Sequence, residues 1–159
     1  MIYLYNESIV HADVDAIATS ANELLQGGLG VDFAIHCAEG EQLDVVCEAI
    51  GFCKTGHAVV TPAFHLKAKY IIHCVTPRYE FEDSLETLRI TYRNVISLAK
   101  AFGCKTVAFP SMGTGAHKFP IQIATEIAVE EIKAAESSFE SIHLYITNDD
   151  MFEVYKTLL

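Results

Sequence analysis

The chain has 159 residues, a size that suits one domain with one hydrophobic core. Hydrophobic residues make up 51% of the chain and charged residues 20%, which excludes an intrinsically disordered protein. The 11 basic and 21 acidic residues give a net charge of −10, which disfavours general nucleic-acid binding because such a surface repels phosphates.

The predicted elements of the first half alternate between strands and helices. They are strands at 1–5 and 14–21, a glycine-rich loop at 22–30, helices at 31–38 and 41–50, and strands at 57–64 and 69–75. Gly51 is expected to end the second helix. Pro62 indicates that its strand lies near a sheet edge or breaks there.

The second half continues the alternation. It predicts a helix at 84–102, a strand at 106–111, a loop at 111–119, a helix from Pro120 to about 136, a strand at 141–147 and a terminal helix in DDMFEVYKTLL. Asp83 and Glu86 resemble an N-cap pair, and Asn148 begins a second N-cap signal. Strands separated by helices indicate an α/β fold with a mostly parallel sheet covered on both faces. Ligands of such sheets bind beyond the carboxyl ends of the strands, where both glycine loops fall.

The two glycine loops are candidates for an anion site. Gly27, Gly28 and Gly30 precede a helix, and SMGTGAHKF also connects a strand to a helix. Glycine lets the backbone approach a ligand closely, and a helix N-terminus offers unpaired N–H donors. The second loop lacks the Walker A spacing and the third glycine of the dinucleotide fingerprint. Each loop alone fits a simple tight turn, whereas the two together suit a diphosphate held from both sides.

Two polar residues flank the first glycine loop. Asp32 lies at the start of the following helix, where it also fits a simple capping charge. Asn22 ends a strand, where asparagine often forms turns. Their position beside the same loop favours a shared ligand.

Nearly the whole chain resembles the macro domain family. Three segments carry the resemblance: DVDAIATSANELLQGGLGVDFAIHCAEG (13–40), CKTGHAVVTPAFHLKAKYIIHCVTP (53–77) and VAFPSMGTGAHKFP (107–120). The chain is most similar to the MacroD-like branch, which includes bacterial O-acetyl-ADP-ribose deacetylases and mono-ADP-ribosyl hydrolases. The resemblance implies a three-layer α/β/α sandwich around a mixed, largely parallel sheet, formed by a single macro domain over 1–159.

The resemblance also implies a site. Asn22 would lie against the distal ribose and Asp32 would orient the attacking water, which makes these two the predicted catalytic residues. The two glycine loops would hold the diphosphate, and His117 would pack on the distal ribose. The predicted ligand-binding residues are Ser8, Ile9, Gly28, Gly30, Val31, Ser111, Met112, Gly113, Thr114, Gly115, Ala116, His117, Thr147 and Asn148. No cofactor and no metal are expected.

Several positions depart from the family pattern. Thr19 replaces the first asparagine of N-A-A-N, and Leu29 replaces a glycine of the first loop. At the adenine end, Ser8 stands where an aspartate usually reads the adenine amino group, and Thr147 or Asn148 where an aromatic ring often stacks. Each lost adenine contact is expected to cost about 1–3 kcal/mol of binding free energy.

We expect hydrolysis of a mono-ADP-ribosylated protein or of O-acetyl-ADP-ribose, with the ADP-ribose part held in the pocket and a water oriented by Asp32. Two alternatives stay open. One is a module that binds ADP-ribose without turnover, which Leu29 and Thr19 favour. The other is a domain for a different nucleotide or sugar phosphate, which the changed adenine end favours.

The remaining features predict no second site. The five cysteines include no C-x-x-C pair, so we expect reduced thiols, several of them buried, with a zinc site among them as the less favoured alternative. His36, His57 and His73 lie in predicted elements and are interpreted as packing or hydrogen-bonding residues. The N-terminus has no basic leader and no apolar run reaches the roughly 18 residues of a membrane span, so we expect a cytoplasmic protein without a membrane partner.

Overall fold

Six strands form one mixed sheet in the computed structural model, which describes residues 1–159. The strands are β1 (Ile2–Tyr5), β2 (Ala16–Ser20), β3 (Ala58–Pro62), β4 (Tyr70–Cys74), β5 (Thr106–Phe109) and β6 (Ser141–Tyr145). Their order across the sheet is β1-β6-β5-β2-β4-β3, and every neighbouring pair is parallel except β3 with β4. Pro62 ends the edge strand β3, as predicted, where its missing N–H costs no internal ladder bond.

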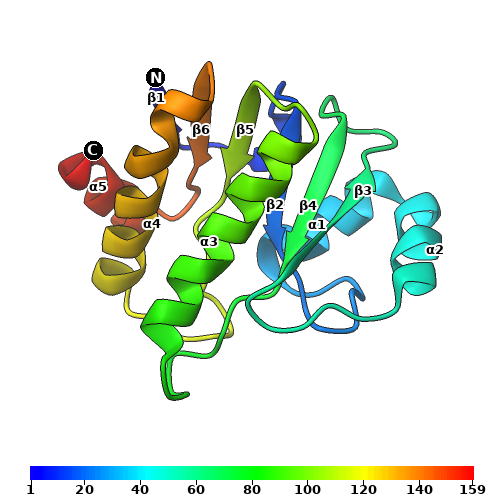
Figure 1. Cartoon of the computed structure of the whole chain (residues 1–159), viewed down its shortest axis with the longest axis horizontal. Coiled ribbons are helices and arrows are strands. Elements are labelled where there is room, and N and C mark those ends of the chain that lie inside the picture. Colours follow the sequence, from blue (N-terminus) through cyan, green and yellow to red (C-terminus); the bar gives the residue numbers. More distant parts are fainter.

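Helices cover both faces of the sheet (Figure 1). They are α1 (Gly30–Glu39), α2 (Glu41–Ile50), α3 (Ser84–Ala101), α4 (Ile121–Ala135) and α5 (Asp149–Leu158), with short 3-10 turns η1 (Ile9–His11) and η2 (Glu136–Ser138). One face carries α3, α4 and α5, and the other carries α1, α2 and η1. The predicted three-layer α/β/α sandwich with a mixed, largely parallel sheet is therefore confirmed. None of the helices combines the length and the apolar character that crossing a bilayer requires.

The central strand β2 shows how the sequence places the two cores. Ala16 and Ala18 pack into the cluster beneath α3 and α4, whereas Ile17 packs into the cluster beneath α1 and α2. Side chains alternate between the faces of a strand, so a run that is apolar at every position fits a strand covered on both sides. The apolar run Ala16–Ala18 thus fits the place of β2 inside the sheet, between β5 and β4.

The helix ends follow the sequence signals with one exception. Gly51 ends α2 at a φ of 82°, a left-handed conformation that glycine adopts readily, and the Asn148 side chain caps α5 by accepting from the Met151 N–H at 3.0 Å. Asp83 does occupy the N-cap position of α3, but at a φ of 59° its side chain makes no capping hydrogen bond. The predicted Asp83–Glu86 capping pair is therefore wrong. Loop geometry places the Asp83 backbone in the left-handed region, away from the extended conformation of a capping residue.

The parallel strands bring distant segments to one edge. The chain leaves the carboxyl ends of β2, β4, β5 and β6 at the same side of the sheet. Residues 20–22, 76, 110–111, 113–117 and 145–148 end these strands or follow them, and they meet there. This is the edge at which ligands bind in open parallel sheets.

Candidate functional site

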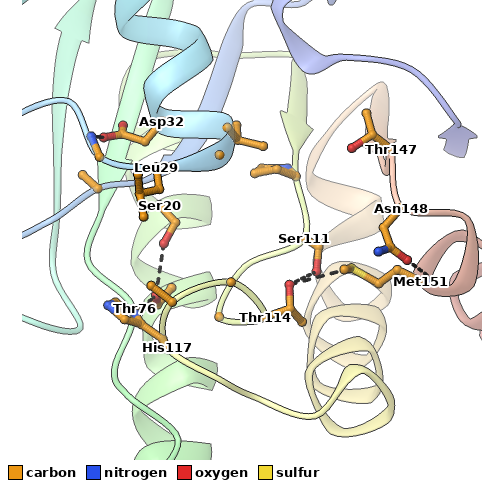
Figure 2. A pocket seen from close by; sticks show the side chains of 18 of the residues that line it. Ser20, Leu29, Asp32, Thr76, Ser111, Thr114, His117, Thr147, Asn148 and Met151 are labelled. Atoms are coloured by element: carbon orange, nitrogen blue, oxygen red, sulfur yellow. Dashed lines mark hydrogen bonds between the residues drawn. The ribbon is translucent and has the colours of Figure 1, made fainter.

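A cavity of about 440 Å³ opens at this carboxyl edge (Figure 2). Its lining comes from the segments that follow four strands, from the start of α1 and from α5. The lining residues are Ser20, Ala21, Asn22, Gly28, Leu29, Gly30, Val31, Asp32, Thr76, Pro110, Ser111, Gly113, Thr114, Gly115, Ala116, His117, Tyr145, Ile146, Thr147, Asn148 and Met151. Asp32 is the one acidic residue among them, and they include no lysine or arginine. Any anion bound here is therefore held by backbone and neutral donors.

Unpaired backbone donors line two sides of the cavity. The N–H groups of Gly30 and Val31 begin α1, whose N-cap residue Leu29 supplies no capping side chain. These two N–H groups, and those of residues 113–117, donate to no acceptor within the protein. A helix N-terminus and a loop of free N–H groups both attract anions. The cavity thus carries two donor sets suited to the two phosphates of a diphosphate.

Asp32 is held rigidly in the cavity wall. Its side chain is 1% exposed. Oδ1 accepts from the Thr19 hydroxyl at 3.0 Å, and Oδ2 accepts from the Gly28 N–H at 2.8 Å. Burial raises the pKa of Asp32 above the usual aspartate value. The Gly28 N–H, the neighbouring imidazole of His36 and the Thr19 hydroxyl hold that pKa down in part, because each favours the charged form.

Asn22 combines both of the roles that its position suggested. It lines the cavity, and its side chain also closes the turn that follows β2. Its amide nitrogen donates to the Gln26 carbonyl at 2.6 Å, and its amide oxygen accepts from the Gln26 N–H at 3.0 Å. One amide hydrogen is left to face a ligand. Asn22 therefore shapes the first loop and keeps one donor available.

Three polar side chains, Ser20, Thr76 and His117, lie in a row on the same side of the cavity as Asp32, as Figure 2 shows. Thr76 Oγ1 lies 3.0 Å from Ser20 Oγ and 2.7 Å from His117 Nδ1. Because a threonine hydroxyl has one hydrogen, Thr76 donates to at most one of these two neighbours and accepts from the other or from both. Burial lowers the pKa of His117, and the charge of Arg78 adds to this, so the imidazole is neutral near pH 7. His117 is thus a half-buried wall residue rather than a freely solvated loop histidine.

Most of the predicted site residues meet in this cavity, and three do not. Ser8, Ile9 and Met112 lie outside the lining. Ile9 is buried in the core beneath α1, and the Ser8 hydroxyl caps η1 by accepting from the Val10 N–H. The fully buried side chain of Met112 turns away from the ligand loop and contacts the Cys74 thiol at 3.3 Å. The ligand-binding roles of these three residues stay predictions, and any contact they make with a ligand would have to come from their backbone groups.

The cavity also has lining residues that were not predicted. They are Ser20, Ala21, Leu29, Thr76, Pro110, Tyr145, Ile146 and Met151. Most of them directly follow a strand, so the strand-end rule applied to every parallel strand finds them. Met151 comes from α5, and nothing in its local sequence indicates that this helix reaches the site.

Replacing Gly113 with alanine is expected to lower Tm by several degrees. Gly113 has a φ of 89°, and an added Cβ would lie 3.0 Å from Phe119 Cδ2. A left-handed conformation costs a non-glycine residue about 1–2 kcal/mol, and the close contact adds to it. Gly115 is the matched control, because it lies in the same loop and a Cβ there meets nothing within 4 Å. Equal Tm values for Gly113→Ala and Gly115→Ala in thermal unfolding would contradict this account.

Comparison with known proteins identifies the family to which this chain is similar. The macro domain family model matches residues 18–128. The macro domain-containing protein TTE0995 of Caldanaerobacter subterraneus subsp. tengcongensis is 43% identical, over 97% of this chain and 93% of its own length. The Oceanobacillus iheyensis macrodomain with ADP superposes with a TM-score of 0.93 at 28% identity, over 98% of this chain and 87% of that one.

A second solved structure is similar over most of its length. The Trypanosoma brucei macrodomain in complex with ADP-ribose has a TM-score of 0.92 at 31% identity, over 98% of this chain and 68% of that one. The solved structures agree with the three-layer fold, and the family model and the relatives agree on the family. This chain therefore belongs to the macro domain family.

Proposed function

We propose that this protein binds ADP-ribose in the cavity and hydrolyses the bond that joins it to a protein side chain or to an acetyl group. The observation that carries the proposal is the Asp32 carboxylate, held in the wall of a cavity whose two sides present free N–H donors. The similar macrodomains from Oceanobacillus iheyensis and Trypanosoma brucei contain ADP and ADP-ribose. ADP-ribose has the diphosphate that the two donor sets suit.

The diphosphate positions the ligand for attack. With its phosphates on the N–H groups of α1 and of residues 113–117, the distal ribose lies toward Asn22 and Asp32. Each carboxylate oxygen of Asp32 accepts one hydrogen bond from the protein and keeps a lone pair for a water. The water oxygen then bonds to the anomeric carbon, which breaks that carbon's bond to the ester oxygen of a protein carboxylate, or to the acyl carbonyl carbon, which breaks that carbon's bond to the ribose oxygen. Asp32 accepts a proton from the water, and the departing oxygen takes up a proton. The products are ADP-ribose and a carboxylic acid.

A second candidate function is ADP-ribose binding without turnover. Two observations favour it. The Asn22 amide already makes two hydrogen bonds to Gln26, which leaves it one donor for the ribose. The Leu29 side chain is 83% exposed at the edge of the cavity. It is larger than the glycine of the family pattern, so it narrows the space for the distal ribose.

Replacing Asn22 with alanine is expected to lower turnover by about 10- to 100-fold, because losing an aligning group misplaces the reacting atoms. The assay measures release of ADP-ribose from a mono-ADP-ribosylated protein and from O-acetyl-ADP-ribose. Calorimetry with ADP-ribose runs in parallel, since the phosphate donors are backbone groups that the substitution keeps. The binding affinity is therefore expected to change less than the rate.

The same assays separate the candidates. ADP-ribose binding with no product release from the unmodified protein would favour the binding module. Stronger thermal stabilisation by another nucleotide or sugar phosphate than by ADP-ribose would favour a different ligand. Turnover that Asn22→Ala leaves unchanged would remove Asn22 from the mechanism.

A further inference from the structure

Three metal-ligating side chains meet in the core beneath α1 and α2, behind the wall that holds Asp32. They are His36 from α1, Cys47 from α2 and His73 from β4. A ring nitrogen of each histidine and the Cys47 Sγ all lie within 4.8 Å of one another. All three residues are buried, with exposed fractions of 7%, 1% and 0%. Nothing in the proposed hydrolysis uses Cys47 or His73.

Each of the two imidazoles has one nitrogen without a partner. His36 Nε2 and His73 Nδ1 are buried and have no hydrogen-bond partner. The other nitrogen of each ring is held from outside. His36 Nδ1 lies 2.8 Å from Asp44 Oδ1, and His73 Nε2 lies 2.9 Å from Thr61 Oγ1. A buried polar atom without a partner is unfavourable, and each histidine of this cluster has one.

This arrangement is typical of a histidine metal site. A ligating imidazole commonly gives its other N–H to a carboxylate or another oxygen, which fixes the tautomer and the ring orientation. With Nε2 of His36 on a metal, Nδ1–H donates to Asp44; with Nδ1 of His73 on the metal, Nε2–H donates to Thr61. We propose that His36 Nε2, His73 Nδ1 and Cys47 Sγ bind one Zn²⁺ ion.

The chemistry of the donors selects the ion. Two imidazole nitrogens and a thiolate suit Zn²⁺, which binds them at about 2.0–2.3 Å in tetrahedral geometry. Such bonds bring the donor atoms to within about 4 Å of one another, so the side chains close slightly on the ion. Asp32 Oδ1 lies 3.8 Å from His36 Nε2 and adds negative charge beside it. Cys47 releases its thiol proton to solvent when the sulfur–zinc bond forms.

The site would join three elements, of which α1 and α2 are already in contact through His36 and Asp44. A Zn²⁺ ion bound there links α1, α2 and β4 directly below the first glycine loop. Because α1 also carries Asp32, the ion fixes the helix that positions the cavity wall. This proposal is independent of the hydrolase proposal, and its test needs no turnover.

The test is metal binding by the full-length protein, stripped with a chelator and kept reduced. Calorimetry with Zn²⁺ is expected to give one ion per chain, and Co²⁺ is expected to give a thiolate-to-cobalt charge-transfer band with tetrahedral visible absorption. Cys47→Ser is expected to abolish the band and to weaken Zn²⁺ binding at least about 10-fold. Asp44→Asn is expected to keep the band and to weaken binding about 10- to 100-fold, because it loosens the orientation of His36.

Two features keep the test decisive. The Asp44 side chain is 60% exposed, so replacing it leaves the hydrophobic core intact. The Asp44→Asn variant therefore still tests the site if the Cys47→Ser protein fails to fold. Cys37 is an exposed free cysteine on α1, and Cys37→Ser is the control for binding by a surface thiol. Absence of the cobalt band in the unmodified protein, its loss in Cys37→Ser, or equal Zn²⁺ affinity in Asp44→Asn and the unmodified protein would overturn the proposal.

Discussion

Replacing Asp32 with asparagine is expected to lower kcat for ADP-ribose release by about 100-fold or more while leaving the fold nearly unchanged. An asparagine retains both of the present contacts, because its oxygen accepts from the Gly28 N–H and its amide nitrogen donates to the Thr19 hydroxyl. It lacks the negative charge and the basic oxygen that orient or deprotonate a water. The asparagine side chain therefore keeps the position of Asp32 but cannot act as a base toward the water.

The measurement is single-turnover release of ADP-ribose from a modified protein, with thermal unfolding run beside it. Asp32→Ala is the companion variant, and it is expected to lose the activity and also some stability. Alanine leaves the buried Thr19 hydroxyl and the Gly28 N–H without their acceptor, which costs about 1–3 kcal/mol for each unsatisfied group. Asp13→Ala, at an exposed position outside the cavity lining, is the control. Full activity in Asp32→Asn would remove Asp32 from the catalytic role.

The sequence predicts the frame of this site well. Strand and helix periods give the α/β order, and in a parallel sheet that order alone brings the segments after β2, β5 and β6 to one edge. Glycines and the strand-end Asn22 lie next to those ends in sequence, so local rules reach them. How far a residue lies from the end of a strand can be read from the local sequence. The residues next to strand ends are therefore the part of the site that a single sequence predicts.

The partners of the site residues depend on contacts that no local rule contains. Thr19 looks like a departure from the family pattern, yet its hydroxyl holds the Asp32 carboxylate across 13 positions of the chain. Ser8 was expected at the ligand, but the turn η1 uses its hydroxyl as a cap and sends Ile9 into the core. In both cases the path of the backbone decides which partner the side chain meets. The cavity lining across from Asp32 comes from the end of β6, the residues that follow it and α5 (Figure 2).

Glu39 also has partners that its local sequence does not predict. It ends α1 in the sequence like an ordinary polar helix residue, and its side chain is nevertheless fully buried. Its two carboxylate oxygens accept from the N–H groups of Phe64, His65 and Leu66, at 2.6, 2.7 and 2.8 Å. One carboxylate thus satisfies three successive donors in the loop between β3 and β4, and joins that loop to the end of α1.

Replacing Glu39 with alanine is accordingly expected to destabilise the fold by about 3–5 kcal/mol, because three N–H groups lose a charged acceptor at once and a cavity opens. For a chain of this length the loss corresponds to a Tm lower by roughly 10 °C or more. Glu48→Ala, at an exposed position on the neighbouring helix α2, is the matched control and is expected to stay within about 0.5 kcal/mol. Glu39 lies at the opposite end of α1 from Gly30, so ADP-ribose affinity measured well below Tm is expected to stay within a few-fold. Equal unfolding free energies for Glu39→Ala and Glu48→Ala would show that the loop finds its acceptors elsewhere.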